Sequence, residues 1–316
     1  MTSILRVSVI TPSYNQAPFL EATIRSVLEQ DYPHIEYIIC DGGSTDGSVD
    51  IIRQYAHRLA YWCSEKDGGQ SEAINKGMAR ASGEIVGWLN SDDVYMKNGI
   101  STIIRGFEAY SHAGLIYGDL QLIDEQSRII GQHPTRSYNF ADQLTHRTII
   151  PQPAAFWRRQ VLDMVGPVRQ DLHYAMDFEF WIRIGLRFPI IYVPGLIAQF
   201  RISGVNKGSA QSAKWGAELF RILDEFYAQP DLPRNVVKLK SAAYAGAYWM
   251  GATTSLTALD MKQTRKWLWE AAWRNPNYLV AGDWWTTLVK ASMGRPLNRW
   301  GRALKVSWRD RYNRNS

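Results

Sequence analysis

Cysteine is scarce in this chain of 316 residues, which contains only Cys40 and Cys63. Both lie inside apolar runs, so we interpret them as buried free thiols rather than as part of a disulfide framework. A cationic and apolar signal peptide is also lacking, because a strand-like segment already begins at Ile4. These two absences predict a protein of a reducing compartment, and we expect it in the cytoplasm.

Long apolar runs are rare as well. Hydrophobic residues make up 46% of the chain and charged residues 21%, as in ordinary globular proteins. Residues 241–259 carry no charge and are numerous enough to span a membrane. They are rich in Ala, Gly, Ser and Thr, however, so we expect a buried helix of a helical bundle instead. We find no fixed-period repeat and no low-complexity segment.

Acidic residues are nearly absent from the C-terminal end. The chain has a net charge of +6. Residues 284–316 contain eight basic residues and one acidic residue, Asp310, so this segment carries +7 and the remainder −1. Nucleic acid, anionic lipid or solubility could each explain a basic tail, and we expect no nucleic-acid partner. Its apolar residues approximate one helical stripe, kinked at Pro296: Leu288, Val289, Met293, Leu297, Trp300, Leu304 and Trp308. Such a helix suits an anionic membrane surface, and equally a helix packed on the body.

Short apolar runs alternate with helical patterns over the first part of the chain. The runs at 7–11, 36–41, 59–64 and 84–89 predict buried strands. Between them, two sets of apolar residues each fall on one helical face: Leu20, Ile24, Val27 and Leu28, and then Ala73, Ile74, Gly77 and Met78. This alternation predicts an α/β fold with a mostly parallel sheet flanked by helices. Such sheets bind ligands at the carboxyl ends of their strands.

The remainder of the chain reads as a continuation of this domain followed by a helical extension. Strands are expected at 115–123 and 196–202, and helices at 159–165 and 177–186. From Ser209 onward the pattern is mostly helical and rich in tryptophan. We therefore predict a first domain over residues 1–208 and a helical extension over 209–316.

Polar motifs follow the first two predicted strands. Thr11-Pro12-Ser13-Tyr14-Asn15 forms a turn that could grip a nucleotide, although an ordinary strand-to-helix turn explains it too. The second motif is Asp41-Gly42-Gly43-Ser44-Thr45-Asp46-Gly47. Its glycines allow close backbone approach, and Asp41 can accept hydrogen bonds from a base or ribose. Ser44 or Thr45 could instead cap the next helix, with Asp46 as a partner of its dipole.

The third strand leads into Glu65-Lys66-Asp67-Gly68-Gly69-Gln70-Ser71 and a helix. Asp67 faces the nucleotide in one interpretation and forms an ion pair with Lys66 in the other. Gln70 and Asn75, near the start of this helix, are further candidates for contact with the nucleotide-sugar.

The fourth strand ends in Asn90-Ser91-Asp92-Asp93. Two adjacent carboxylates after an apolar strand are costly unless a positive group lies beside them. Mg²⁺ or Mn²⁺ bridging to a diphosphate is the natural partner, because hard cations prefer oxygen ligands. Since adjacent side chains diverge, we expect one carboxylate on the metal and the other on ribose or a structural donor. A solvated turn or a helix cap is the alternative.

Two later segments complete the candidate site. Asp177 opens an aromatic-rich helix, where a carboxylate is stabilised as an anion and can accept a proton from a hydroxyl. Plain helix capping explains it as well. Arg201 and Lys207 follow a predicted strand and could close on phosphates, or belong to a solvated turn.

Together these motifs resemble the family 2 glycosyltransferases of the GT-A fold. The resemblance covers about residues 4–208 and rests on the order and spacing of the motifs beginning at Val9, Asp41, Asn90 and Asp177. It implies an inverting transfer of one sugar from a nucleoside-diphosphate sugar to a hydroxyl acceptor, with a divalent cation. The acceptor class includes polyprenyl-diphosphate-linked sugars of cell-surface polysaccharide or glycolipid assembly, at the inner face of the membrane.

The resemblance also implies roles for individual residues. Asp177 matches the catalytic base, and Asp93 matches the metal ligand, with Asp92 beside it on ribose. The nucleotide-sugar contacts are the remaining candidates: Thr11, Pro12, Tyr14, Asn15, Asp41, Gly43, Ser44, Asp67, Gln70, Asn75, Asp92, Arg201 and Lys207.

The chain departs from the family pattern at three places. Gly42 stands where members often have a second aspartate, and Met176 stands where many have a glutamate before the base. The Gln-x-x-Arg-Trp motif of processive synthases is lacking, which favours single-sugar transfer. A sugar-nucleotide pyrophosphorylase is one rival, but residues 11–15 lack its glycine-rich basic loop. A non-catalytic protein on a transferase scaffold is another, and the intact Asp41, Asp93 and Asp177 argue against it.

Overall fold

The computed structural model describes residues 4–147, 149–203 and 212–293. The chain divides into two compact units: residues 1–143 with 148–204, and residues 144–147 with 205–316. The predicted boundary between residues 208 and 209, Lys207 and most of the basic tail lie outside the described residues.

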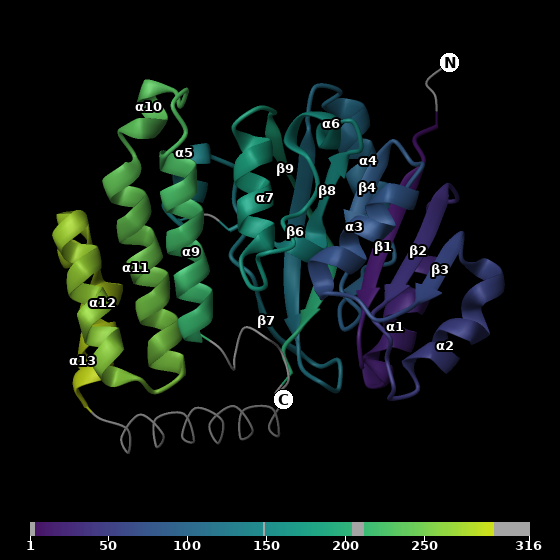
Figure 1. Ribbon diagram of the computed structural model, residues 1–316, viewed down its shortest axis with the longest axis horizontal. Coiled ribbons are helices and arrows are strands. Elements are labelled where there is room, and N and C mark those ends of the chain that lie inside the picture. The colour runs from purple at the N-terminus through teal and green to yellow at the C-terminus, as the bar shows by residue number, and fades with distance from the viewer. Residues whose placement is uncertain (1–3, 148, 204–211, 294–316) are drawn as a thin grey trace. The chain divides into compact units, whose positions relative to one another are not determined.

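The first unit is an α/β layer structure built on a nine-stranded mixed sheet (Figure 1). Its strands are β1 (Val7–Ser13), β2 (Ile35–Asp41), β3 (Tyr61–Ser64), β4 (Ile85–Trp88), β5 (Val94–Tyr95), β6 (Leu115–Ile123), β7 (Ile129–Gln132), β8 (Ala155–Arg158) and β9 (Ile190–Arg201). Its helices are α1 (Ala17–Leu28), α2 (Ser48–Tyr55), α3 (Gln70–Arg80), α4 (Gly99–Ala109), α5 (Phe140–Leu144), α6 (Val161–Val165) and α7 (Met176–Gly185), with short 3₁₀ turns η1 (Ala56–Arg58) and η2 (Gln152–Ala154).

The order of the strands brings the predicted motifs to one edge of the sheet. The order is β3-β2-β1-β4-β8-β6-β9-β5, with β7 paired to β6. Strands β3, β2, β1 and β4 are mutually parallel, and so are β6 and β9, whereas β8 and β5 run antiparallel to their neighbours. Because the carboxyl ends of β1 to β4 share an edge, the loops that follow them are neighbours.

Helices cover both faces of this sheet, which explains why β1 and β2 read as apolar on both sides. Apolar residues of α1, α2 and α4 pack on one face, together with Val7, Val9 and Ile39. On the other face, Ala73 of α3 packs with Ile38 and Cys40. The four predicted residues of α3 are all buried, as expected from their spacing.

The two cysteines are free and face each other across adjacent strands, with Cys40 of β2 in register with Cys63 of β3. Cys40 is buried, as the sequence predicts, whereas Cys63 on the edge strand is only partly buried.

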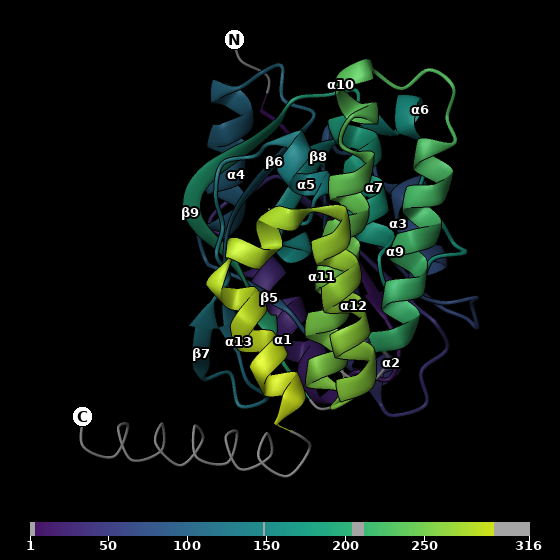
Figure 2. The same cartoon turned by 90° about the vertical axis from the view of Figure 1, so that its left-hand side faces the viewer.

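The second unit is helical, as predicted (Figure 2). Its elements are α9 (Ser212–Tyr227), α10 (Arg234–Val237), α11 (Lys240–Thr257), α12 (Met261–Arg274), η3 (Pro276–Val280) and α13 (Gly282–Ser292). Helix α11 is the uncharged segment, and its small residues let neighbours approach closely. Gly251 of α11 and Gly216 of α9 both lie against the ring of Trp267, where a β-carbon would collide. Among the described residues, no helix combines the length and apolar character that crossing a bilayer requires.

Candidate active site

Asp41 organises the edge of the sheet at the ends of three strands. Ser13, Asp41 and Ser64 are neighbours in register across β1, β2 and β3. The buried Asp41 carboxylate accepts hydrogen bonds from the Ser44 N–H at 2.8 Å and from the Ser64 hydroxyl at 2.7 Å. It also accepts from the Gly43 N–H at 3.1 Å. Asp41 therefore shapes the loop after β2, and Gly43 adopts the left-handed conformation that this loop requires, with φ +81°.

The turn after β1 is joined to the same loop. Asn15 donates its N–H to the Ser44 hydroxyl at 2.8 Å and accepts from the Thr45 N–H at 2.9 Å. Tyr14 projects beside it with 62% of its surface exposed, so its ring is available to a ligand. Neither Ser44 nor Thr45 caps α2, because the N-cap of that helix is Gly47. Asp46, the expected partner of the helix dipole, accepts hydrogen bonds from the Ala17 N–H at 2.9 Å and the Ser48 N–H at 3.0 Å.

Thr11, a predicted nucleotide contact at this turn, lies in the interior of the sheet. Its side chain is buried, and its hydroxyl pairs with that of Tyr37 at 3.1 Å, inside the sheet. Pro12 is also buried. The residue that the sequence did not single out is Ser13, whose buried hydroxyl has no hydrogen-bond partner in the part of the chain that the structure describes.

Gly42 and Asp67 bring two of the loops into contact. A β-carbon on Gly42 would lie 3.0 Å from Oδ1 of Asp67, so a larger residue there would displace this carboxylate. Asp67 accepts a hydrogen bond from the Gly69 N–H at 2.9 Å. No ion pair joins it to Lys66 within the described residues, and Lys76 instead pairs with acidic neighbours on either side of that loop. The glycine that departs from the family pattern thus makes room for Asp67.

A network of side-chain amides holds the turn after β4. Asn90 accepts hydrogen bonds from Gln70 and from the indole N–H of Trp88, both at 2.7 Å. Its own NH₂ donates to Gln152 at 2.9 Å, and Gln152 donates in turn to the Trp88 carbonyl at 2.5 Å. Gln70 therefore fixes Asn90 in this structure. Sequence reasoning missed Gln152, because this residue comes from the distant turn η2 before β8.

Asp92 and Asp93 lie in unlike environments. Asp93 is fully buried, with an exposed fraction of 0%, and its Oδ1 accepts the Arg201 N–H at 2.9 Å. Burial, and then the neighbouring Asp92, raise the pKa of Asp93 well above its usual range. Asp92 is partly exposed, and burial also raises its pKa, against the opposing effect of Arg201. The solvent-facing carboxylate of the pair is thus Asp92, not Asp93.

Arg201, the predicted phosphate contact, binds backbone carbonyls in this arrangement. It is 2% exposed and donates to the Asp92 carbonyl at 2.9 Å and the Asp124 carbonyl at 2.8 Å. A further bond reaches the Ser127 hydroxyl at 3.0 Å, and the guanidinium lies over the ring of Phe19. Arg201 therefore joins the end of β9 to the turn that carries Asp92.

Asp177 lies in the first turn of α7 and is partly exposed. It accepts a hydrogen bond from the Phe178 N–H at 2.8 Å. We expected the helix terminus to stabilise its anion, but burial has the larger effect and raises the pKa of Asp177 to about 6. Such a carboxylate is still mostly ionised at neutral pH and is a stronger base than an ordinary one.

Helix α3 connects the start of α7 to the other loops. Ser71 donates to the Leu172 carbonyl at 3.2 Å and contacts the sulfur of Met176 at 3.1 Å. Ser71 is adjacent to Gln70, which holds Asn90, so one helical turn contacts both carboxylate-bearing segments. Asn75, a predicted nucleotide-sugar contact, binds the Val168 backbone through two hydrogen bonds, of 2.7 and 3.0 Å.

Comparison with known proteins agrees with this geometry. Residues 8–165 match the profile of the family described as Glycosyl transferase family 2. An uncharacterized glycosyltransferase of Mycobacterium tuberculosis, Rv1514c, is 32% identical over 222 residues, which cover 68% of this chain and 82% of that protein. The chain belongs to glycosyl transferase family 2. A shorter match, 46% identical over 95 residues, joins this glycosyltransferase to Bacillus subtilis TuaG, a glycosyltransferase named for teichuronic acid biosynthesis, and covers 29% of this chain and 38% of TuaG.

Solved structures share the fold of this glycosyltransferase. S. aureus TarS in complex with UDP-GlcNAc superposes with a TM-score of 0.59 at 15% identity, over 86% of this chain and 92% of that chain. The mannosyltransferase PcManGT from Pyrobaculum calidifontis, in complex with GDP-Man and Mn²⁺, superposes with a TM-score of 0.61 at 19% identity, over 92% and 87%. The fold is therefore the GT-A fold, as the motifs predicted.

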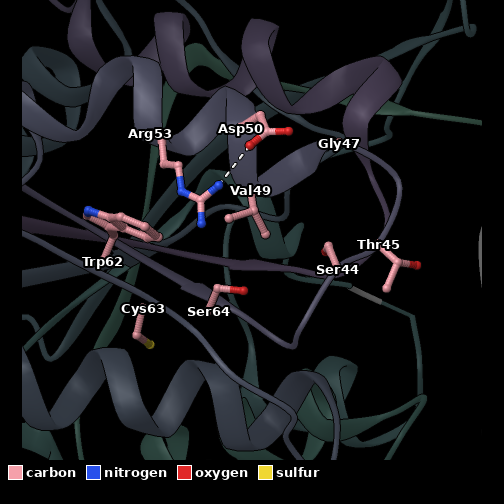
Figure 3. Close-up of a pocket in the computed structure, with 9 residues that line it drawn as sticks. All are labelled: Ser44, Thr45, Gly47, Val49, Asp50, Arg53, Trp62, Cys63 and Ser64. Carbon is pink, nitrogen blue, oxygen red and sulfur yellow. Dashed lines mark hydrogen bonds and ion pairs between the residues drawn. The ribbon is translucent and has the colours of Figure 1, made fainter.

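A surface cavity of about 560 Å³ adjoins Asp41 in the glycosyltransferase (Figure 3). It lies between the loop after β2, the start of α2 and the edge strand β3, with Trp62 on one wall. Ser44 and Ser64, which both bind Asp41, line it. Asp92 and Asp177 do not line this cavity. The candidate catalytic site is therefore defined by these carboxylates and not by the cavity.

The protein ligands for a cation are few. In the described ranges, no three His, Cys, Asp or Glu side chains gather into a metal-binding group. A cation that arrives with a diphosphate needs only one or two carboxylates from the protein, because the phosphates and water complete its shell. The partly exposed Asp92 fits that requirement, whereas Asp93, the predicted metal ligand, is fully buried.

Replacing Arg201 by lysine is expected to destabilise the glycosyltransferase by about 2–4 kcal/mol, because an ammonium group cannot reach the carbonyls that the planar guanidinium joins. Thermal unfolding of the purified proteins measures this effect. Arg128→Lys is the matched control, since Arg128 pairs with Asp124 at 2.7 Å but its side chain is 74% exposed. Equal melting temperatures for the two variants would contradict the structural role of Arg201.

Proposed function

We propose that this glycosyltransferase moves one sugar from a nucleoside-diphosphate sugar to a hydroxyl acceptor, with inversion at the anomeric carbon. The observation that carries the proposal is the placement of Asp177. Asp177 is a partly exposed residue whose pKa burial raises to about 6. It lies in the first turn of a helix held by Ser71, which is adjacent to Gln70, the residue that binds Asn90. Asp177 would act as the base, and Asp92, which follows Asn90, would face the diphosphate of the donor. This pair of carboxylates suits direct displacement of the diphosphate by the acceptor hydroxyl.

The donor's nucleoside is assigned to the edge at the ends of β1, β2 and β3. Tyr14 offers an exposed ring, Asp67 a partly exposed carboxylate, and Asn15 and Ser44 a turn of polar groups. Two proteins of the same fold are known in complex with UDP-GlcNAc and GDP-Man, which supports a nucleoside-diphosphate sugar as the donor class.

The cation ligand is reassigned in this proposal from Asp93 to Asp92. Only Asp92 of the pair is partly exposed, and PcManGT is known with Mn²⁺, so Mn²⁺ or Mg²⁺ is the cofactor class. When bound, such a cation would offset negative charge on the donor's diphosphate. Asp93 helps to position Asp92 indirectly. It accepts a hydrogen bond from the Arg201 N–H, and the Arg201 side chain donates to the Asp92 carbonyl.

Asp177 accepts the proton of the acceptor hydroxyl in the proposed step. The acceptor oxygen forms a bond to the anomeric carbon while the bond from that carbon to the diphosphate breaks, and the nucleoside diphosphate leaves with the electron pair. The proton remains on Asp177 until solvent removes it. A carboxylate with a raised pKa suits this role, since it holds the proton more strongly than an ordinary aspartate does.

The pH dependence of transfer tests the ionisation of Asp177. Its pKa is raised to about 6, so the base is ionised above that pH and becomes protonated as pH falls through it. We expect kcat to decline about tenfold for each pH unit below about 6, and Asp177→Glu to shift the midpoint of the profile. Initial rates at saturating donor measure this. A midpoint near 4 in the wild-type protein would contradict the assignment.

The acceptor is assigned to the class used in cell-surface polysaccharide assembly, including polyprenyl-diphosphate-linked sugars. Support comes from TuaG, whose name refers to teichuronic acid biosynthesis. Such acceptors reside in a membrane, so we propose a cytoplasmic protein that binds the inner face of the membrane peripherally. The basic tail of residues 284–316, with a net charge of +7, supports this location.

Hydrolysis of a panel of sugar nucleotides with Mn²⁺ tests the proposed reaction class. Release of free sugar and nucleoside diphosphate supports a glycosyltransferase that uses that donor. Release of sugar phosphate and nucleoside triphosphate in the presence of pyrophosphate would indicate a pyrophosphorylase instead. Failure to bind any donor in a thermal-shift screen, together with no turnover, would indicate a non-catalytic protein.

A further inference from the structure

The second unit exposes large apolar side chains along α12, η3 and α13. Trp269 and Trp273 are one helical turn apart on α12, and they are 54% and 79% exposed. On α13, Trp285 and Val289 are four residues apart and exposed, and Met293 at the C-cap follows at the same spacing. Leu279 and Val280 of η3 are exposed as well. Together these seven residues are called the aromatic face.

Ring contacts join Trp269 and Trp285 of the aromatic face through the buried Trp284. The ring of Trp269 lies 4.9 Å from that of the buried Trp284, which lies 4.9 Å from that of Trp285. The indole N–H of Trp285 donates to the Leu279 carbonyl at 2.7 Å, which fixes η3 beside α13. The buried Trp284 donates to the Leu268 carbonyl at 3.0 Å and so anchors α13 on α12. The exposed rings therefore sit on a rigid base.

Basic residues border the aromatic face. Lys262 and Lys266 precede Trp269 and Trp273 on the same stripe of α12, and Lys290 follows Trp285 on α13. Residues 261–293 contain five basic and two acidic residues, a net charge of +3, and Glu270 already pairs with Arg274. The sequence beyond this point, residues 294–316, adds seven basic residues against one acidic residue, a net charge of +6.

We propose that the aromatic face is a docking surface for an anionic lipid bilayer. Indole rings partition to the boundary between headgroups and acyl chains, because one part of the ring is apolar and the N–H is polar. The lysines beside them are attracted to anionic headgroups. A protein partner would more often meet an apolar core with few charges, whereas here a net positive charge accompanies the rings and continues along the chain.

Docking at a bilayer would hold the enzyme where a lipid-linked acceptor resides, and this role rests on the proposed function. It adds a location within the described residues 262–293, which does not include residues 294–316. No residue of the aromatic face belongs to the candidate active site. Membrane docking and sugar transfer can therefore be tested independently.

Flotation of the full-length protein with vesicles tests the docking surface. We expect binding to vesicles of equal parts phosphatidylglycerol and phosphatidylcholine, and much weaker binding to phosphatidylcholine alone. Trp273→Ala with Val280→Ser, which changes two residues that are 79% and 86% exposed, should lower the partition coefficient about tenfold or more. Lys262→Glu with Lys266→Glu should remove the preference for anionic vesicles.

The matched control changes exposed apolar residues of the other unit. Tyr110→Ala with Ile129→Ser, at 42% and 63% exposure, should leave flotation unchanged. Arg299→Glu with Arg302→Glu, made in the full chain, reports on the tail. Loss of flotation in this tail variant, with wild-type flotation in the Trp273 and Val280 variant, would overturn the proposal.

Two further outcomes would also overturn it. One is a wild-type protein that does not float with anionic vesicles. The other is a wild-type dimer in light scattering that Trp273→Ala converts to a monomer, which would assign the face to self-association. Donor hydrolysis without vesicles should be the same in the wild-type and the Trp273→Ala proteins. If neither form hydrolyses any donor but the wild type floats, the proposed reaction fails and the docking surface stands.

Discussion

Replacing Asp177 by asparagine is expected to lower the rate of sugar transfer by a factor of about 10²–10⁴, the range over which general bases contribute. Asparagine has the shape of aspartate and can still accept the hydrogen bond from the Phe178 N–H, so α7 should keep its first turn. The amide cannot take a proton from the acceptor hydroxyl. Donor affinity should change little, because the nucleoside is assigned to the ends of β1, β2 and β3.

Two measurements together test this expectation. Initial rates with a hydroxyl acceptor report the loss of the base, and the thermal shift caused by the donor with Mn²⁺ reports binding. Asp163→Asn is the matched control, since Asp163 is an exposed carboxylate in the first turn of the neighbouring α6. Asp163→Asn should transfer sugar at the wild-type rate. An Asp177→Asn protein with wild-type turnover would show that another group takes the proton.

The architecture of the first unit was predictable because its pattern is physically simple. Strands buried on both faces must be apolar throughout, and the helices between them must present one apolar stripe. The predicted strand at 115–123 coincides with β6, and the predicted helix at 177–186 differs from α7 by one residue at each end. Strand β9 begins earlier than predicted, at Ile190, because Pro194 and Gly195 interrupt its apolar pattern.

The motifs located the edge of the sheet but not the direction of each side chain. Thr11 and Tyr14 are close in sequence, yet one hydroxyl is buried against Tyr37 and one ring is exposed. Residues at the end of a strand alternate between faces and then enter a turn, so residue type alone does not tell which of them meets a ligand. Asn75 shows the same limit, since its amide serves the backbone of Val168.

Burial and long-range partners explain the remaining differences. Arg201 looked like a phosphate ligand because it is basic and follows a strand. Its actual partners are carbonyls of Asp92 and Asp124, which lie 109 and 77 residues away in the chain. The pKa of Asp177 likewise depends on its surroundings, which raise it, and the helix terminus alone suggested the opposite direction.

Replacing Asp92 by asparagine has the second large expected effect, and it separates the two adjacent carboxylates. We expect kcat to fall by about 10²–10³, the usual cost of removing one electrostatic partner of a developing charge. The concentration of Mn²⁺ needed for half-maximal rate should rise as well, because an amide is a weaker ligand for a hard cation than a carboxylate. Metal titrations at saturating donor measure both quantities.

Asp93→Asn is the matched variant for this experiment, because the two positions are adjacent and the chemical change is the same. Asp93 is fully buried, and its raised pKa favours the neutral form, which asparagine resembles. The amide oxygen can still accept the Arg201 N–H, so folding stability should change by about 1 kcal/mol or less. The Mn²⁺ requirement should then stay near that of the wild type.

The opposite result would contradict the assignment of Asp92. If Asp93→Asn raises the Mn²⁺ requirement and Asp92→Asn does not, the buried carboxylate must become accessible when the donor binds, and the metal ligand is Asp93.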